Sequence, residues 1–207
     1  TWGANDLMQE NDTYRVGTFG THGNRFSNLA VQNSDFILSL GCRMDTKATG
    51  SPPESFAREA WKAIIDIDIH ELNKYDQTKL NFDCKIHSDL KTFLTLFKKV
   101  IIRNTNKTPN FNNWLNIISS WKIKYDPILE SKNQNLKGIN PYKVFSDLSD
   151  HIGLKTSVFI DTGCAIAWVM QAFKLKGNQR LFHDFNNTAM GWALPAALAG
   201  ASFHKNK

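Results

Sequence analysis

The chain has 207 residues, of which 42% are hydrophobic and 12% aromatic, a composition typical of a globular protein with a substantial core. Its longest apolar runs, at 36–40 and 64–69, are far shorter than the roughly 20 residues that cross a membrane, so we expect no membrane partner. The three cysteines are odd in number and widely spaced, which argues against a disulfide framework or a zinc site and favours a reducing, cytoplasmic setting.

The net charge of +6 is unevenly distributed along the chain. Residues 1–90 hold 9 basic and 13 acidic side chains, whereas residues 91–207 hold 16 basic and 6 acidic ones. Much of the basic excess lies between Lys91 and Lys143, and a basic patch with aromatic residues can bind nucleic acid. Lysine-rich helix surfaces are common without any partner, however, so we interpret this segment as a solvated face and expect no nucleic-acid partner.

Short apolar runs alternate with helical patterns in chain order. The runs at 35–41, 62–69 and 156–163 are rich in β-branched residues and predict buried strands of a parallel sheet. Helical patterns cover 24–33, 88–102, 111–125, 141–152 and 165–174. The alternation predicts the α/β class, with a three-layer, doubly wound, Rossmann-like parallel sheet followed by the first part of a second α/β domain.

Local signals refine these boundaries. Ser88 is the predicted N-cap of a helix with an apolar stripe, and Pro141 after Asn140 predicts a first-turn proline. The stretch 126–140 is polar and aperiodic, which predicts a linker. We therefore expect one domain at 1–125, a linker at 126–140 and a second domain at 141–207.

Three segments of the first half carry groups that suit a nucleotide. The stretch "VGTFGTHGNRFSNLA" places Gly17, Gly20 and Gly23 before a helix, where backbone N–H groups can meet a diphosphate; the alternative is a plain glycine turn. "GCRMD" and "DIDIHEL" place charged side chains directly after predicted strands. Carboxylates there can bind ribose hydroxyls or, alternatively, cap the next helix. Three such segments in order favour a nucleotide site.

The order of motifs identifies a family. "GTFGTHG", "NLAVQNSDFILSLGCRMD", "AIIDIDIHELNK" and "HSDLKTFL" resemble the middle domain of thiamine-diphosphate enzymes of the acetolactate synthase type. "NPYKVFSDLSD", "VFIDTGCAIAW" and "NNTAMGWALPAALAGA" resemble the opening of that family's diphosphate-binding domain. The resemblance covers the chain from about Tyr14 to Ser202 and is specific because seven segments match in order.

The resemblance implies a middle domain that holds FAD in acetolactate synthases, whereas many relatives keep this domain with no flavin or with another nucleotide. "DTK" stands where the family has "DDR", so Lys47 replaces a flavin-contacting arginine, and the two side chains are not interchangeable. His22 has no second ligand at metal spacing, so we expect no metal site within the chain. The implied nucleotide-binding residues are Gly20, Thr21, His22, Gly23, Gly41, Cys42, Arg43, Asp45, Asp66, Ile67, Asp68, Glu71 and Asp89.

In the second half, the resemblance implies that the turn with Thr162, Gly163 and Cys164 contacts thiamine diphosphate. The family's "GQH" or "GNH" is here "GCA", which removes two polar side chains and leaves the backbone contact together with the Thr162 side chain. Met190 matches the bulky apolar residue on which the cofactor bends, and it is the implied catalytic residue. The alternative for Met190 is ordinary core packing at a helix start.

The implied activity is decarboxylation of pyruvate, a 2-keto acid, and carboligation to a second carbonyl compound, in an intact homodimer or homotetramer. A 2-keto-acid decarboxylase and a non-catalytic nucleotide-binding module are the alternatives. The family's Mg²⁺ ligands would come after the last residue and its activating glutamate before the first one. We therefore expect the chain to be an internal portion of an intracellular enzyme that shows no activity alone.

Overall fold

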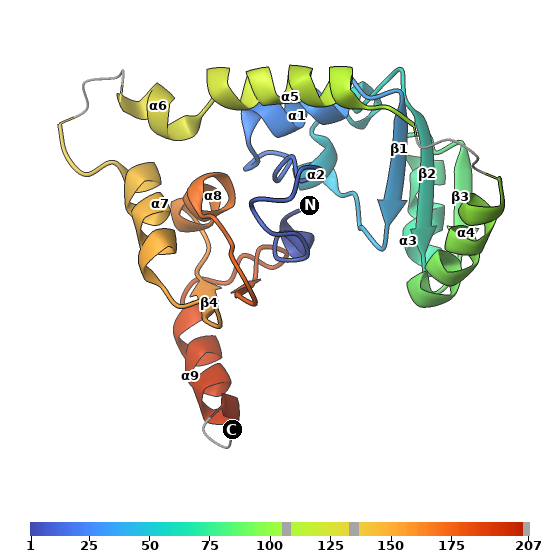
Figure 1. Ribbon diagram of the computed structural model, residues 1–207. Coiled ribbons are helices and arrows are strands. Elements are labelled where there is room, and N and C mark those ends of the chain that lie inside the picture. The colour runs from blue at the N-terminus through green and yellow to red at the C-terminus, as the bar shows by residue number, and fades with distance from the viewer. Residues whose placement is uncertain (105–108, 133–136, 205–207) are drawn as a thin grey trace. The chain divides into compact units, whose positions relative to one another are not determined.

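The computed structural model describes residues 1–104, 109–132 and 137–204 (Figure 1). The chain divides into two compact units, Asn28–Ser120 and Thr1–Ser27 together with Trp121–Lys207. Helix α1 (Arg25–Gln32) and helix α5 (Asn112–Lys124) each cross a boundary between the units. These two units do not coincide with the domains expected at 1–125 and 141–207. The domain assignment made from the sequence stays a prediction.

The unit Asn28–Ser120 is built on a three-stranded parallel sheet in the order β1-β2-β3. The strands are β1 (Phe36–Leu40), β2 (Trp61–Asp66) and β3 (Cys84–His87). The central strand β2 is buried from Lys62 to Asp66, and Ile64 and Ile65 are 0% exposed. The parallel pairing of the first two strands confirms the predicted α/β class, whereas β3 was not predicted because "CKIH" is short and only half apolar.

Short helices connect these strands. They are α2 (Thr46–Thr49), the 3-10 turns Pro53–Ser55 and Lys74–Gln77, and α3 (Ile69–Asn73), which packs on β2 and β3. Helix α4 (Leu90–Asn104) follows β3 and holds no buried residue among those described. The predicted cap at Ser88 is wrong: α4 begins one residue later than that cap requires, and Asp89 Oδ1 accepts from the Thr92 N–H at 3.0 Å instead.

The other unit contains a second parallel pair, β4 (Ser157–Ile160) and β5 (Arg180–His183). Its helices are the 3-10 turn Trp2–Ala4, α6 (Pro127–Lys132), α7 (Pro141–His151), α8 (Cys164–Ala172) and α9 (Ala193–His204). Helix α7 packs on α8, and α9 packs on β4 (Figure 1). The core is formed by α8 together with buried residues of the segment 173–185, which includes β5; Val169 is 0% and Leu181 8% exposed, and Trp2 packs against it from the start of the chain.

Several local predictions can be compared with this unit. Asn140 caps α7 by accepting from the N–H groups of Tyr142 and Lys143, so the predicted start at Pro141 is confirmed. The stretch 126–140 contains α6, which its polar and aperiodic sequence did not indicate. Neither β5 nor α9 was predicted. Within the described residues, no helix is both long and apolar enough to cross a membrane.

Candidate cofactor-binding sites

The carboxyl ends of β1 and β2 bring two of the predicted residues together. Arg43 Nε lies 3.5 Å from Glu71 Oε1, and Glu71 also accepts from the Lys74 ammonium group. The Arg43 carbonyl oxygen accepts from the Tyr75 hydroxyl at 2.7 Å and from Lys74. Burial, followed by the charge of Glu71, raises the pKa of Tyr75, so its hydroxyl remains a donor. Lys74 and Tyr75 hold the Arg43 segment in place, and sequence reasoning missed both.

The aspartates at this edge act as helix caps. Asp45 Oδ1 accepts from the N–H groups of Lys47 and Ala48 at 3.0 and 3.1 Å, and Asp68 Oδ1 accepts from that of His70 at 2.8 Å. Asp66, 9% exposed, accepts from the Asp68 N–H at 2.9 Å. The capping alternative therefore holds for Asp45 and Asp68, as it does for Asp89. Contact of these carboxylates with ribose stays a prediction.

The rest of the edge presents a mixed surface. Ile67, between the two aspartates, is 67% exposed, and Cys42 is half-buried. Gly41 donates its N–H to the Ile65 carbonyl oxygen at 2.8 Å, which extends the pairing of β1 with β2 by one residue. An apolar side chain flanked by acids at the end of parallel strands suits a flat ring with a polar tail.

The glycine loop, residues 17–24, closes on itself. Gly23 donates to the Gly20 carbonyl oxygen at 3.0 Å, and the Asn24 N–H donates to that of Thr18 at 2.8 Å. A Cβ atom on Gly23 would lie 2.3 Å from the Thr18 oxygen, so a glycine is required by the close approach of two backbone segments. Thr21 Oγ1 lies 3.0 Å from His22 Nδ1. This loop and the β1–β2 edge belong to different compact units, and the single groove expected from them stays a prediction.

At the carboxyl end of β4, one carboxylate organises the starts of two helices. Asp161 Oδ1 accepts from the N–H groups of Thr162 at 2.9 Å and Gly191 at 3.0 Å, while Oδ2 accepts from that of Ala193 at 3.2 Å. These backbone donors, Thr162 first, hold the pKa of Asp161 below its ordinary value. The first turns of α8 and α9 are therefore fixed beside the same turn.

The Thr162–Gly163–Cys164 turn fits a diphosphate group. Gly163 has φ 82°, and a Cβ atom there would meet no atom within 4 Å, so the space above the turn is open. Among the described residues, no side chain caps the N-terminus of α8, and Cys164 is exposed. Uncapped N–H groups at a helix start attract anions through hydrogen bonding and the helix dipole. The turn can hold phosphate oxygens with backbone atoms alone.

Met190 directly precedes Gly191, whose N–H is bound to Asp161. Its side chain is 91% exposed, so the core-packing alternative does not hold in the structure described. Across residues 1–104, 109–132 and 137–204, no group of three or more His, Cys, Asp or Glu side chains converges as metal ligands.

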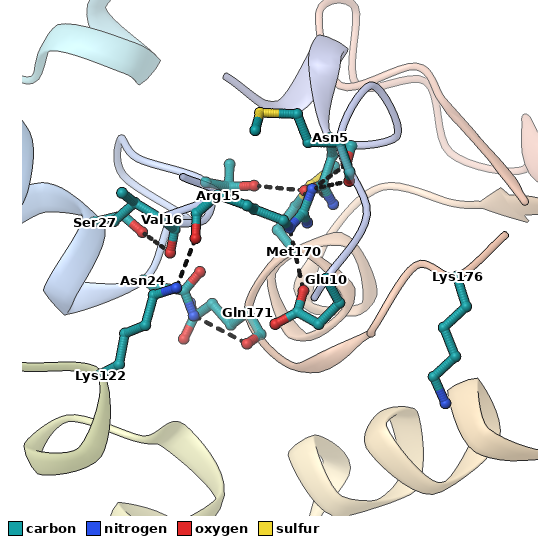
Figure 2. A network of polar contacts seen from close by, with 12 residues as sticks. Asn5, Glu10, Arg15, Val16, Asn24, Ser27, Lys122, Met170, Gln171 and Lys176 are labelled. Carbon is teal, nitrogen blue, oxygen red and sulfur yellow. Dashed lines mark hydrogen bonds and ion pairs between the residues drawn. The ribbon is translucent and has the colours of Figure 1, made fainter. Parts of the chain in front are cut away.

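Sequence reasoning also missed a polar network around Arg15 (Figure 2). The Arg15 guanidinium donates to the carbonyl oxygens of Asn5 and Met8 at 2.6 and 2.7 Å and pairs with Glu10 at 3.2 Å. Lys122 donates to the Arg15 carbonyl oxygen at 2.6 Å, and burial lowers the pKa of Lys122. A cavity of about 160 Å³ lies beside these groups. Asn5, Met8 and Glu10 lie five to ten residues from Arg15 in no periodic pattern, and Lys122 lies 107 residues away, so no local signal indicated the network.

Comparison with known proteins shows which family and which relatives the chain resembles. Residues 1–97 match the family described as "Thiamine pyrophosphate enzyme, central domain". The chain is 28% identical over 193 residues to the acetolactate synthase large subunit of Lactococcus lactis subsp. lactis (strain IL1403), covering 93% of this chain and 32% of that protein. It is 30% identical over 204 residues to the acetolactate synthase large subunit of Cyanidium caldarium, covering 99% of this chain and 33% of that protein. The chain thus spans about a third of the length of these relatives.

Proposed function

Because residues 1–97 match the family described as "Thiamine pyrophosphate enzyme, central domain", we propose that the chain serves an enzyme of the acetolactate synthase large-subunit type. The proposed reaction is decarboxylation of a 2-keto acid, pyruvate in the simplest case, followed by joining of the remaining fragment to a second carbonyl compound. The similarity over 93% and 99% of the chain supports this, because it extends through the second half and its cofactor turn.

The observation that carries the proposal is the bridge that Asp161 forms between the starts of α8 and α9. Thiamine diphosphate supplies the carbanion stabilisation that a 2-keto acid needs in order to lose carbon dioxide. This chain would bind and orient its diphosphate through the backbone N–H groups of Gly163 and Cys164 in the turn, because that of Thr162 already donates to Asp161. The N-terminal end of the α8 dipole at this turn favours the negative charge of the diphosphate. We propose Mg²⁺ as the counterion of the diphosphate and assign it no ligand in this chain.

Met190 is proposed to contact the same cofactor. An apolar side chain that is 91% exposed leaves its whole surface in water, which is unfavourable unless something covers it. Its place directly before Gly191, within the Asp161 bridge, puts it beside the proposed diphosphate turn. We propose that it orients the cofactor by packing against it.

FAD is proposed as a second ligand, at the β1–β2 edge. The support is the exposed Ile67 between two aspartates and the Arg43 segment held by Tyr75. Lys47 follows the Asp45 cap in place of the family's arginine, so a flavin would meet an ammonium group there rather than a planar guanidinium. Absorbance between 350 and 500 nm of the purified protein, roughly the range of a bound flavin, tests this ligand directly.

The intact enzyme is proposed to be a homodimer or homotetramer that acts in the cytoplasm. Helix α9 exposes apolar side chains along its length, with Leu194 71%, Leu198 63% and Phe203 85% exposed. A helix that is apolar on all sides is normally buried, which supports coverage by further protein. The proposed cytoplasmic setting is supported by the three cysteines, which are odd in number and widely spaced in the sequence.

Titration with thiamine diphosphate and Mg²⁺, followed by the fluorescence of Trp168 on α8 and Trp192 before α9, tests the proposal. We expect saturable quenching, and we expect Asp161→Asn to weaken binding about tenfold because one helix start loses its acceptor. Asp184→Asn is the matched control, since Asp184 also accepts a backbone N–H in a turn, that of Asn187. Absence of a fluorescence change at millimolar cofactor, or equal affinities of the two variants, would refute the assignment of the turn.

A further inference from the structure

The last turn of α8 is tied to the glycine loop by side chains of both segments. Gln171 Nε2 donates to the His22 carbonyl oxygen at 3.2 Å. Asn24 Nδ2 donates to the Gln171 carbonyl oxygen at 3.0 Å (Figure 2). Asn24 is only 5% exposed, and its backbone N–H is the one that closes the loop on Thr18. Two hydrogen bonds in opposite directions therefore join the loop to the helix.

A second contact joins the neighbouring residue of α8 to the same loop. Asn5 Nδ2 donates to Met170 Sδ at 3.6 Å, and Asn5 Oδ1 accepts from the Thr18 hydroxyl at 3.1 Å and from Arg15 at 2.7 Å. Asn5 and Thr18 are 5% and 2% exposed. Buried polar groups with specific partners hold a single arrangement, because any other leaves them without hydrogen bonds.

The other end of α8 is the proposed diphosphate turn. The helix runs from Cys164 to Ala172, a distance of about 12 Å at the usual rise per residue. Ile166 and Val169, on its inner face, are 1% and 0% exposed, so the helix is packed along its length. A regular, packed helix transmits a displacement of its last turn to its first.

We propose that Gln171 and Asn24 are positioning residues, through which the glycine loop sets the position of the Thr162–Cys164 turn. This proposal rests on the proposed function, because it takes that turn as the diphosphate-binding turn. A ligand that orders the glycine loop would then also order the turn, and thiamine diphosphate at the turn would order the loop, since such coupling is reciprocal.

Hydrogen exchange measured by mass spectrometry on the ligand-free chain tests the connection without any cofactor. Gln171→Glu removes the donor to the His22 carbonyl and leaves the size of the side chain unchanged. We expect the amides of Gly23 and Asn24, and those of α8 back to Trp168, to exchange about three to ten times faster. Gln171→Lys, which keeps a donor at this position, is expected to restore most of the protection.

Gln179→Glu is the matched control. Gln179 is 3% exposed and donates to the Gly153 carbonyl oxygen at 3.0 Å, so the same chemical change is made at a buried glutamine outside α8. We expect faster exchange near Gly153 and unchanged exchange in α8. Faster exchange confined to the glycine loop and the last turn of α8 in Gln171→Glu would overturn the proposal, because a local structural contact would do no more than that. If far-UV circular dichroism shows that Gln171→Glu is unfolded, the exchange rates of Asn24→Asp and Gln171→Lys are compared instead.

Titration with thiamine diphosphate and Mg²⁺ then separates the two proposals. We expect Gln171→Glu to bind about three to ten times more weakly than the unchanged chain and Gln179→Glu to bind equally well. Equal affinity of Gln171→Glu and the unchanged chain would overturn the positioning role while leaving the proposed function intact. No binding by the unchanged chain would refute the proposed function, and the exchange data would still decide whether the loop and the turn are connected.

Discussion

The Lys62 ammonium group lies 2.9 Å from the carbonyl oxygen of Ala57, in the interior of the unit Asn28–Ser120. It also donates to the Ala60 carbonyl oxygen at 2.8 Å, and Lys62 as a whole is only 7% exposed. Ala57 has φ 41°, a left-handed conformation that is unfavourable for a residue with a Cβ atom. The Lys62 side chain therefore stabilises the strained turn at Ala57, beside the central strand.

Lys62→Ala is expected to lower the free energy of unfolding by about 3 kcal/mol, because it removes two charge-assisted hydrogen bonds and the buried stem. Lys62→Met, which keeps the stem, should lose less. Lys85→Ala on β3 is the control, since Lys85 pairs with the exposed Asp76 and should lose less than about 1 kcal/mol. Urea denaturation measures all three, and similar losses in Lys62→Ala and Lys85→Ala would contradict the role given to Lys62.

For Ser39 on β1, we expect that a substitution does not lower the stability of the fold. It is 5% exposed, and its hydroxyl is the buried side-chain group for which the described part of the chain offers no hydrogen-bond partner. Ser39→Ala should leave stability unchanged or raise it by about 1 kcal/mol, because an unsatisfied hydroxyl is removed. Ser149→Ala should instead lower stability by about 1 kcal/mol, since that hydroxyl, 1% exposed, donates to the Ser146 carbonyl oxygen at 2.6 Å. Thermal unfolding that places both variants on the same side of the unchanged chain would count against this.

The glycine loop is expected to tolerate no side chain at Gly23. A Cβ atom there would lie 2.3 Å from the Thr18 oxygen and 2.6 Å from Phe19 Cα, both backbone atoms that cannot rotate away. Gly23→Ala should therefore lower the free energy of unfolding by about 2 kcal/mol or more. Gly3→Ala, where a Cβ atom meets nothing within 4 Å, should be nearly neutral. Denaturation curves that coincide for the two variants would show that the loop is not closed as described.

Replacing Met190 is expected to weaken cofactor binding while leaving the stability of the fold unchanged. Because its side chain is 91% exposed, Met190→Ala should change the free energy of unfolding by less than about 0.5 kcal/mol. On the proposed function it should nevertheless weaken thiamine diphosphate binding, measured by the same fluorescence titration. Leu7→Ala, at a side chain that is 78% exposed in the N-terminal segment, should change neither quantity. A loss of stability without a loss of affinity would assign Met190 to packing instead.

The elements predicted from sequence were those with strong periodicity or strong end signals. The runs that became β1, β2 and β4 each contain three consecutive apolar residues, and the start of α7 was marked by Asn140 and Pro141 together. Strand β3 has the sequence "CKIH" and α6 lies in a polar stretch, so for them tertiary contacts outweigh any local signal.

The candidate site was predictable only in part. The positions of strand ends follow from the apolar runs, which is why Asp66 was located correctly at the end of β2 and the Thr162–Cys164 turn after β4. Whether a carboxylate caps a helix or meets a ligand depends on which N–H groups the fold brings near it, as the contacts of Asp161 with Gly191 and Ala193 show. The Arg15 network could not be predicted, because its near partners follow no periodic pattern and Lys122 lies 107 residues away in the sequence.

His183 carries the last prediction, which concerns pH. Its side chain is half-buried, with Nε2 3.2 Å from the Trp2 carbonyl oxygen, while Nδ1 accepts from the Phe185 N–H at 3.2 Å. Nδ1 can accept only in the neutral ring, and burial lowers the pKa of His183 below its ordinary value. The folded chain therefore takes up this proton at lower pH than the unfolded chain does.

The sign of the effect follows from that difference. Between the lowered pKa of the folded state and the ordinary value of about 6.5, the unfolded state binds more protons, so the free energy of unfolding falls as the pH drops below about 6.5. The contribution is fully present above that pH.

His183→Gln keeps a donor and an acceptor but has no proton to gain, so its stability should fall less between pH 7.5 and 5.5 than that of the unchanged chain. His70→Gln, at an exposed position on α3, should keep the original slope. Parallel pH profiles for the unchanged chain and His183→Gln, measured by urea denaturation, would show that His183 is protonated in the folded chain as readily as in the unfolded one.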